Sequence, residues 1–288
     1  MISIIICSAN KEKCDVAINN VSSTIGVPFE LIIIDNRIDN KPICVAYNEG
    51  ARKATFEILC FMHEDIIFKT LDWGKKIVET FSDNKIGLLG VAGSYYYGLA
   101  PVSWFGTTEK EINILWSPEE KHTELLFETH FPEKRITEVV VIDGVFMVSR
   151  KSIFKKISFD ESLLPGFHGY DIDISLQVHQ THKVMVTKDI LIEHFSRGSL
   201  NQEWFNAISN ISKKWSSHLP EYLSFYTKKE IRHLNAQASW NFYLLAAKYI
   251  KNIKRVRLYF YYSLRQGQLL FAFKKILGHL LMKAEKNK

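Results

Sequence analysis

Three short hydrophobic runs near the start of the chain constrain its fold more than any other feature. Residues 2–7, 30–35 and 57–62 are apolar, and the first two are rich in β-branched side chains. Such runs are typical of strands buried on both faces. The segment between the second and third runs places small apolar residues on one face of a helix. A strand–helix–strand order at this spacing predicts a parallel sheet with right-handed crossovers.

Polar residues follow each of these predicted strands. They occupy positions 8–10, 35–36 and 63–65. In open parallel sheets, ligands bind outside the carboxyl ends of the strands, so we expect a site where these three tips meet. No GxGxxG follows the first strand and the chain has no GxxxxGK[ST], which disfavours a dinucleotide-binding or P-loop protein.

The rest of the chain continues the α/β pattern. We expect a helix at 73–81, a strand from residue 86, and another over 138–148 that Asp143 and Gly144 interrupt. Residues 95–137 show no clear period and predict loops and short elements over a cleft. A helix over 171–182, two strand-like pieces in 184–194 and amphipathic helices at 201–217 and 235–251 follow.

The composition is that of a globular protein. The chain has 288 residues, of which 47% are hydrophobic, and Gly and Pro together number 21, which excludes a disordered chain. The four cysteines have no zinc-site spacing and predict reduced, mostly buried thiols in a cytoplasmic protein. The N-terminal segment lacks the basic region of a signal peptide, and no stretch has the length of a transmembrane helix.

The motif His63-Glu64-Asp65 offers a first candidate site, because a carboxylate at a strand end can hold a divalent cation and through it a diphosphate. A solvated strand end is the alternative. Asp143 is a carboxylate within an apolar run, where it needs a partner or a function.

Asp171 in the segment GFHGYDID is either a helix N-cap or a general base held against an acceptor hydroxyl. His194 opens the loop FSRG and is either structural or a metal ligand.

The order of these motifs resembles that of a known family. The helix AYNEGARKA, FMHED, IDGVFMVSR, FDESLLPGFHGYDIDISL and IEHFSRGS follow one another as in the family 2 glycosyltransferases of GT-A fold, and in particular their StrF-like branch. The resemblance covers roughly residues 1–205. It implies an α/β GT-A fold with a mostly parallel central sheet flanked by helices. We expect a glycosyltransferase domain over 1–217 and a basic helical extension over 218–288.

The resemblance also implies residue roles, with donor-binding residues on the nucleotide side and metal ligands next to the diphosphate. Asp171 falls where inverting members keep their catalytic base, with Asp173 as the second choice. Asp65 and His194 match the metal ligands, and Asp143 matches a carboxylate that lines the sugar. The residues expected to bind the donor are Ser8, Asn10, Asp35, Asn36, Asp65 and Asp143.

His63 departs from the family pattern, because it occupies the position at which the metal motif has its first aspartate. The cation, Mn²⁺ or Mg²⁺, then has fewer carboxylate ligands, and a mixed oxygen and imidazole shell suits Mn²⁺ at least as well. We place Trp104 and His168 on the acceptor side, since flat side chains stack on sugar rings. Packing of these aromatic side chains over the sheet is the alternative.

The last 41 residues differ from the rest in charge. Eleven Lys or Arg and one acid give residues 248–288 a net charge of +10, which leaves −4 for residues 1–247. A basic amphipathic helix with aromatic residues predicts peripheral membrane contact on the cytoplasmic face. A helical appendage that packs on the catalytic domain or mediates self-association is the alternative. Because the positive charge lies in this tail and the rest of the chain is mildly acidic, nucleic acid is not an expected partner.

Together these features predict a metal-dependent, inverting glycosyltransferase that moves a sugar from a nucleotide-sugar donor, a UDP-sugar being favoured, to a carbohydrate or lipid-linked hydroxyl. A nucleotidyltransferase is disfavoured by the lack of a glycine-rich loop after the first strand. A non-catalytic glycan- or nucleotide-binding protein that kept the fold is the remaining alternative.

Overall fold

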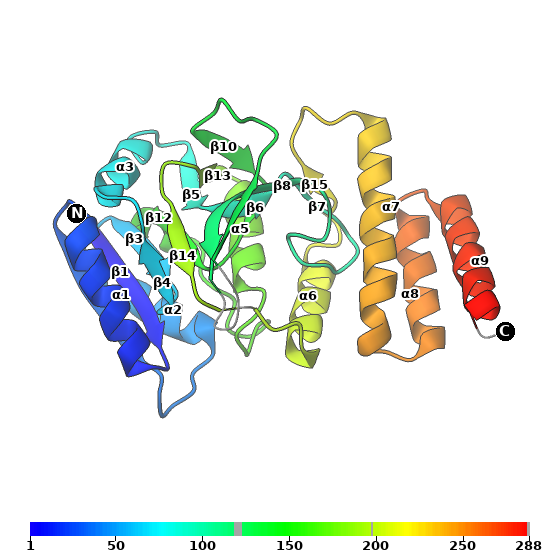
Figure 1. Cartoon of the computed structure of the whole chain (residues 1–288), viewed down its shortest axis with the longest axis horizontal. Helices are drawn as coiled ribbons and strands as arrows, with labels where there is room; N and C mark the ends of the chain where they lie inside the picture. The colour runs from blue at the N-terminus through cyan, green and yellow to red at the C-terminus, as the bar shows by residue number, and fades with distance from the viewer. Residues whose placement is uncertain (118–122, 197, 287–288) are drawn as a thin grey trace.

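A seven-stranded mixed sheet forms the centre of the protein (Figure 1). The computed structural model describes residues 1–117, 123–196 and 198–286. Five strands of this sheet run in one direction, and β12 and β10 oppose them, as expected of a mostly parallel sheet. In sheet order, the strands are β10 (Ile136–Val139), β13 (Lys183–Thr187), β5 (Ile86–Gly90), β12 (Phe146–Arg150), β3 (Ile58–Met62), β1 (Ile2–Ser8) and β2 (Phe29–Asp35).

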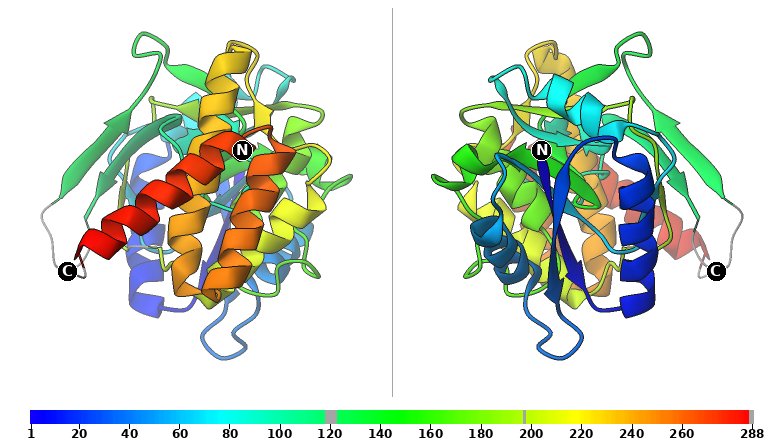
Figure 2. Two further views of the ribbon diagram at one scale, coloured as in Figure 1. Left: turned by 90° about the vertical axis from the view of Figure 1, so that its right-hand side faces the viewer. Right: turned by 90° about the vertical axis from the view of Figure 1, so that its left-hand side faces the viewer.

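The first two helices lie on opposite faces of this sheet (Figure 2). The chain crosses from β1 to β2 and then back past β1 to β3, so right-handed crossovers place α1 (Lys11–Thr24) and α2 (Ile43–Lys53) on different sides. On the α2 side, the ring of Tyr47 packs on Phe61 of β3 and on Tyr170 of α5 (Tyr170–His179). Two short helices, α3 (Trp73–Thr80) and α4 (Lys151–Phe154), follow β4 (Ile66–Phe68) and β12 along the chain.

The strand β2 differs from the sequence-based expectation. It lies at the edge of the sheet, and the side chains of Leu31 and Ile33 are exposed rather than buried. A hydrophobic run predicts burial but does not reveal that a strand has only one neighbour.

A second sheet includes two strands, β8 and β9, in the segment 95–137, where the sequence predicted loops and short elements. It has the order β11-β6-β8-β14-β4, and β9 pairs with β8. The strand β8 escapes pattern analysis because the polar side chains of Glu111 and Asn113 are buried within it, and their partners lie far away in sequence. The bounds are β4 (Ile66–Phe68), β6 (Ala92–Ser94), β8 (Lys110–Trp116), β9 (Glu124–Glu128), β11 (Val141–Ile142) and β14 (Ile192–His194), with β7 (Tyr96–Tyr97) and β15 (Glu221–Tyr222) forming a separate pair.

Helices make up the C-terminal part of the described chain. They are α6 (Gln202–Lys214), α7 (Lys228–Leu245), the 3-10 turn η1 (Ala246–Lys248), α8 (Asn252–Arg265) and α9 (Leu269–Lys286). The helix α7 begins seven residues earlier than predicted, because Thr227 and Glu230 form a capping box. It packs on α6 through the stacked rings of Phe205 and Phe242.

These helices stand side by side at the end of the molecule farthest from β1 and β2 (Figure 1). None of the helices in the described ranges combines the length and the hydropathy that crossing a membrane would require. The predicted boundary at residue 217 stays a prediction; β15, just beyond it, pairs with β7.

Candidate active site

A cavity of about 470 Å³ lies between the end of β3, the end of β14 and the start of α5. It brings together five residues that the sequence singled out from four separate segments. They are Trp104, Asp143, His168, Asp171 and His194. His63, from the metal motif, also lines the cavity.

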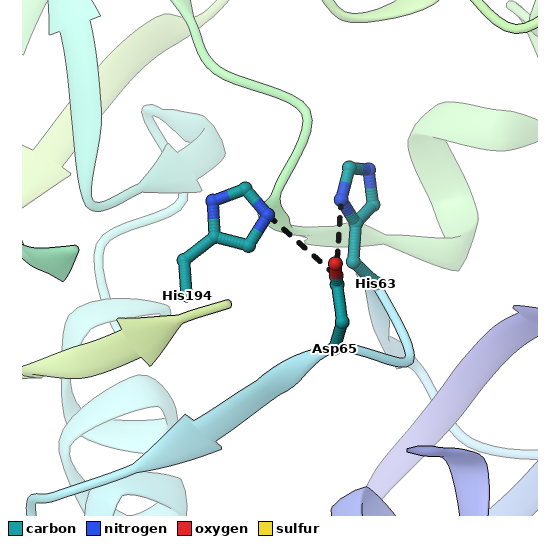
Figure 3. A group of neighbouring side chains, drawn as sticks. All are labelled: His63, Asp65 and His194. Carbon is teal, nitrogen blue, oxygen red and sulfur yellow. Dashed lines mark ion pairs between the residues drawn. The ribbon is translucent and has the colours of Figure 1, made fainter. Parts of the chain in front are cut away.

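His63, Asp65 and His194 form one cluster at this cavity, which we call the histidine cluster. The Nδ1 atom of His63 lies 3.8 Å from Oδ1 of Asp65, and Nε2 of His194 lies 3.5 Å from the same oxygen. Both imidazoles point toward this carboxylate (Figure 3). The three ligand atoms all lie within 4.8 Å of one another. One carboxylate oxygen and two ring nitrogens at this spacing are a suitable donor set for a divalent transition metal.

Burial and charge set the protonation of the histidine cluster. Burial, assisted by the nearby His194, lowers the pKa of His63, which favours the neutral imidazole that can bind a metal. Burial acts to raise the pKa of Asp65, but the hydrogen bond from His194 and the electrostatic interactions with the two imidazoles outweigh it and keep this pKa well below its usual range. Asp65 is therefore ionised at neutral pH.

Tyr170 orients His63, and sequence reasoning missed it. Its buried hydroxyl lies 2.8 Å from Nε2 of His63 and donates a hydrogen bond to the carbonyl of Gly144 at 3.3 Å. This contact holds the ring of His63 with its Nδ1 atom on the side of Asp65. Outer hydrogen bonds of this kind fix the orientation and tautomer of metal-binding histidines. The signal was the tyrosine next to Asp171 in the segment GFHGYDID.

Asp143 and Asp171 form a carboxylate pair on another side of the cavity. The indole of Trp104 donates to Oδ2 of Asp143 at 2.7 Å, and the amide of Val145 donates to its Oδ1 at 2.8 Å. Asp171 accepts from the amides of Gly144 at 3.2 Å and Ile172 at 2.9 Å. Gly144 is required here, because a Cβ would lie 2.3 Å from the hydroxyl of Tyr170.

Asp171 of the carboxylate pair has an unusual pKa. Burial, followed by the charge of Asp143, raises the pKa of Asp171 from 3.8 to about 7. None of the hydrogen bonds and ion pairs described for Asp171 involves a cationic side chain. A carboxylate with this pKa at a cavity wall can accept a proton at neutral pH.

Comparison with known families decides the class of the protein. The family model of the Glycosyltransferase like family matches residues 3–237, which is most of the chain. The chain belongs to this family. No curated protein matches it in sequence. The enzyme is thus a glycosyltransferase, as its sequence predicted.

Solved structures give the fold of the enzyme. It is similar to the mannosyltransferase PcManGT from Pyrobaculum calidifontis, solved with GDP-Man and Mn²⁺, with a TM-score of 0.51 at 12% identity over 96% of this chain and 86% of that one. It is also similar to GalNAc-T7, solved with UDP, GalNAc and Mn²⁺, with a TM-score of 0.51 at 9% identity. That match covers 97% of this chain but 57% of GalNAc-T7. These likenesses confirm the predicted GT-A fold.

The enzyme does not bring Asp173 into the cavity. Its carboxylate is buried and accepts hydrogen bonds from the indole of Trp215 at 2.8 Å and from Gln177 at 2.8 Å. The ammonium of Lys214 lies 2.8 Å from it. These contacts tie α5 to α6, so Asp173 has a structural environment although it lies only two residues from Asp171.

Ser8 and Asn10 lie at the tip of β1, where Glu64 holds them. The hydroxyl of Ser8 donates to Oε2 of Glu64 at 2.8 Å, and the amides of Ala9 and Asn10 donate to Oε1 at 3.2 and 3.1 Å. The side chain of Asn10 caps α1 by accepting from the amide of Lys13. Sequence reasoning missed Glu64, and its position within the metal motif was the available signal.

Asp35 and Asn36 lie beyond the tip of β2, away from the lining of the cavity. Asp35 is exposed and forms a two-pronged ion pair with Arg37, whose hydrogen bonds lower the pKa of Asp35 to about 2. Asn36 is buried and holds Lys41 by bonding both its amide and its carbonyl.

Proposed function

We propose that the enzyme is a metal-dependent, inverting glycosyltransferase of the StrF-like branch that uses a nucleotide-sugar donor. The observation that carries this proposal is the placement of the histidine cluster and the carboxylate pair around one cavity. The first has the chemistry of a cation site and the second has the chemistry of a base, and this reaction needs both.

The histidine cluster fits a divalent cation, since its three ligand atoms converge and the contact with Tyr170 holds Nδ1 of His63 on the side of Asp65. Two imidazoles and one carboxylate favour Mn²⁺ over Mg²⁺, which prefers oxygen ligands. When bound there, such a cation supplies positive charge that stabilises the departing diphosphate. Asp65, being ionised, provides the negative charge of the site, and Tyr170 holds the ring of His63 in place.

Asp171 is the proposed general base. Its carboxylate accepts the proton of the acceptor hydroxyl as that oxygen attacks the anomeric carbon from the face opposite the diphosphate. This attack inverts the anomeric configuration. The amides of Gly144 and Ile172 fix the carboxylate, and a base of this kind contributes about 10²- to 10⁴-fold to the rate.

The proposal extends to the donor and the acceptor. We favour a UDP-sugar, with Ser8, Asn10, Asp35 and Asn36 on the nucleotide side and Asp143 beside the sugar. PcManGT and GalNAc-T7 were solved with nucleotides and Mn²⁺, which supports a donor of this class. The acceptor is a carbohydrate or lipid-linked hydroxyl, placed near Trp104 and His168, which line the cavity.

We assign the enzyme to polysaccharide biosynthesis on the cytoplasmic side of the membrane. Cys7, Cys14, Cys44 and Cys60 are all free thiols, which supports a reducing compartment.

A thermal-shift screen of nucleoside diphosphates with and without Mn²⁺ tests the proposal. We expect one nucleotide to raise the melting temperature only when Mn²⁺ is present, and Asp65→Asn to abolish this rise. Asp83→Asn, an exposed carboxylate away from the cavity, serves as the control and retains the rise. If no nucleotide shifts the wild type, the enzyme assignment of this site fails and a non-catalytic glycan-binding protein becomes the better description.

A further inference from the structure

The outer face of the last two helices carries many exposed apolar side chains, and the proposed catalysis does not use it. In α9, Leu269, Leu270, Phe273 and Leu277 recur at helical spacing and are all exposed. The exposed fractions are 81% for Leu270 and 60% for Leu277. Figure 2 shows α9 as the outermost element at this end of the molecule.

The neighbouring helix α8 extends this apolar surface. Ile253 and Leu264 lie on one face of α8 and are 71% and 60% exposed. Phe260 lies between them on that face, and its ring packs on the ring of Phe273 with 4.6 Å between centroids. This contact joins the stripes of the two helices into one surface, which we call the α8–α9 face.

Basic side chains border the α8–α9 face. Arg257 follows Ile253 by one helical turn, and Lys274 follows Leu270 by one turn; both are exposed. Lys254 is exposed on α8 as well. The only acid in residues 248–288 is Glu285, and the segment carries a net charge of +10. An apolar stripe flanked by cations is the pattern of a helix that lies in a membrane interface.

We propose that the α8–α9 face binds the surface of an anionic lipid bilayer, independently of the proposed transfer reaction. A bilayer of this kind offers both partners that the face requires, namely acyl chains for the leucines and negative headgroups for the lysines and arginines. A second copy of the chain packed face to face would place two segments of charge +10 against each other, which opposes self-association through this surface. The helices lie on the bilayer rather than cross it, in agreement with their hydropathy.

Flotation of the full-length protein with lipid vesicles tests this proposal. We expect binding to phosphatidylcholine vesicles containing 30% phosphatidylglycerol, at least tenfold weaker binding to pure phosphatidylcholine, and loss of most binding in 0.5 M salt.

Two sets of variants, each with a control, separate the contributions of the apolar and the basic side chains to vesicle binding. Leu270→Ser/Phe273→Ser/Leu277→Ser and Lys254→Gln/Arg257→Gln/Lys274→Gln should each reduce anionic vesicle binding at least tenfold. Ile38→Ser, an exposed apolar residue elsewhere, and Lys11→Gln/Lys75→Gln/Lys85→Gln, which removes the same charge elsewhere, should leave it unchanged.

Two outcomes would overturn the proposal. One is equal or absent binding to the two vesicle types. The other is a dimer in light scattering that the leucine variant converts to a monomer without any change in vesicle binding, which would make the face a subunit interface. Unchanged circular dichroism and melting temperature establish that each variant is folded.

Discussion

At one side of the cavity, the carboxylate of Asp65 has two imidazoles as neighbours. At another side, the carboxylate of Asp171 is buried and feels the negative charge of a second carboxylate, Asp143. The first environment holds the pKa of Asp65 well below its usual range, and the second raises the pKa of Asp171 to about 7. Residues of the same chemical type thus acquire opposite properties within one site. Asp65 is suited to bind a cation, and Asp171 is suited to exchange a proton.

The comparison extends to Asp173, on the same helix turn as Asp171. Lys214, Gln177 and Trp215 satisfy its carboxylate completely, whereas Asp171 is held by two backbone amides and keeps access to the cavity. We infer that the contacts of a carboxylate, rather than its place in the motif, determine which of the two takes part in the reaction.

The largest expected effect is that of Asp171→Asn. Because asparagine keeps the shape but cannot accept the proton, we expect transfer to fall by about 10²- to 10⁴-fold, while nucleotide binding in the presence of Mn²⁺ is unchanged. Transfer is measured by mass spectrometry of the glycosylated product, and binding by thermal shift. Asp173→Asn provides the comparison and should affect stability more than nucleotide binding. Transfer at the wild-type rate by Asp171→Asn would remove Asp171 from the role of base.

The next largest effect concerns the histidine cluster. His194→Ala removes one of three converging ligands and should weaken Mn²⁺ binding by about 100-fold. Loss of a hydrogen bond to a metal ligand already costs about 10- to 100-fold in metal affinity, and loss of the ligand itself should lie at the upper end of this range. The free Mn²⁺ signal in electron paramagnetic resonance measures this without reference to activity. His233→Ala, which removes an exposed histidine of α7, is the matched control. Equal Mn²⁺ affinity in the two variants would mean that His194 is not a ligand.

A smaller effect is expected for Tyr170→Phe. The ring continues to pack on Tyr47, but the hydroxyl that contacts Nε2 of His63 is lost. Mn²⁺ affinity should fall by about tenfold. Tyr96→Phe removes a buried hydroxyl that donates to Asn235, far from the cavity, and should leave Mn²⁺ affinity unchanged. If both variants bind Mn²⁺ as the wild type does, the hydroxyl of Tyr170 does not orient His63.

The sequence predicted the parts of the molecule that depend on local pattern. The strands β1 and β3 follow from hydrophobic runs. Of the polar residues predicted after the first three strands, His63 lines the cavity, whereas Asp35 and Asn36 lie beyond the tip of β2 and do not line it.

What could not be predicted depends on contacts between distant segments. The strand β8 contains Glu111, which accepts from Thr129, and Asn113, which donates to the carbonyl of Ile190. Their burial breaks the alternation that marks a strand. The contact of Tyr170 with His63 joins residues 107 positions apart. Likewise, the motif names both Asp171 and Asp173, but only the position of Lys214 shows which of them is neutralised.

The smallest expected effect is a shift in the pH dependence of transfer, and it tests the electrostatic coupling within the carboxylate pair. The base must be ionised to act, and its pKa is about 7, so kcat/KM should rise with pH below 7 and level off above it. In Asp143→Asn, the negative charge that helps raise this pKa is gone, so the rise should move to lower pH. Burial is the larger cause and remains, so the pKa should stay above 3.8.

The pH profile of kcat/KM from pH 5 to 9 measures this, with Asp83→Asn as the control for a charge removed elsewhere. A profile for Asp143→Asn that coincides with that of the wild type would show that the charge of Asp143 does not raise the pKa of Asp171.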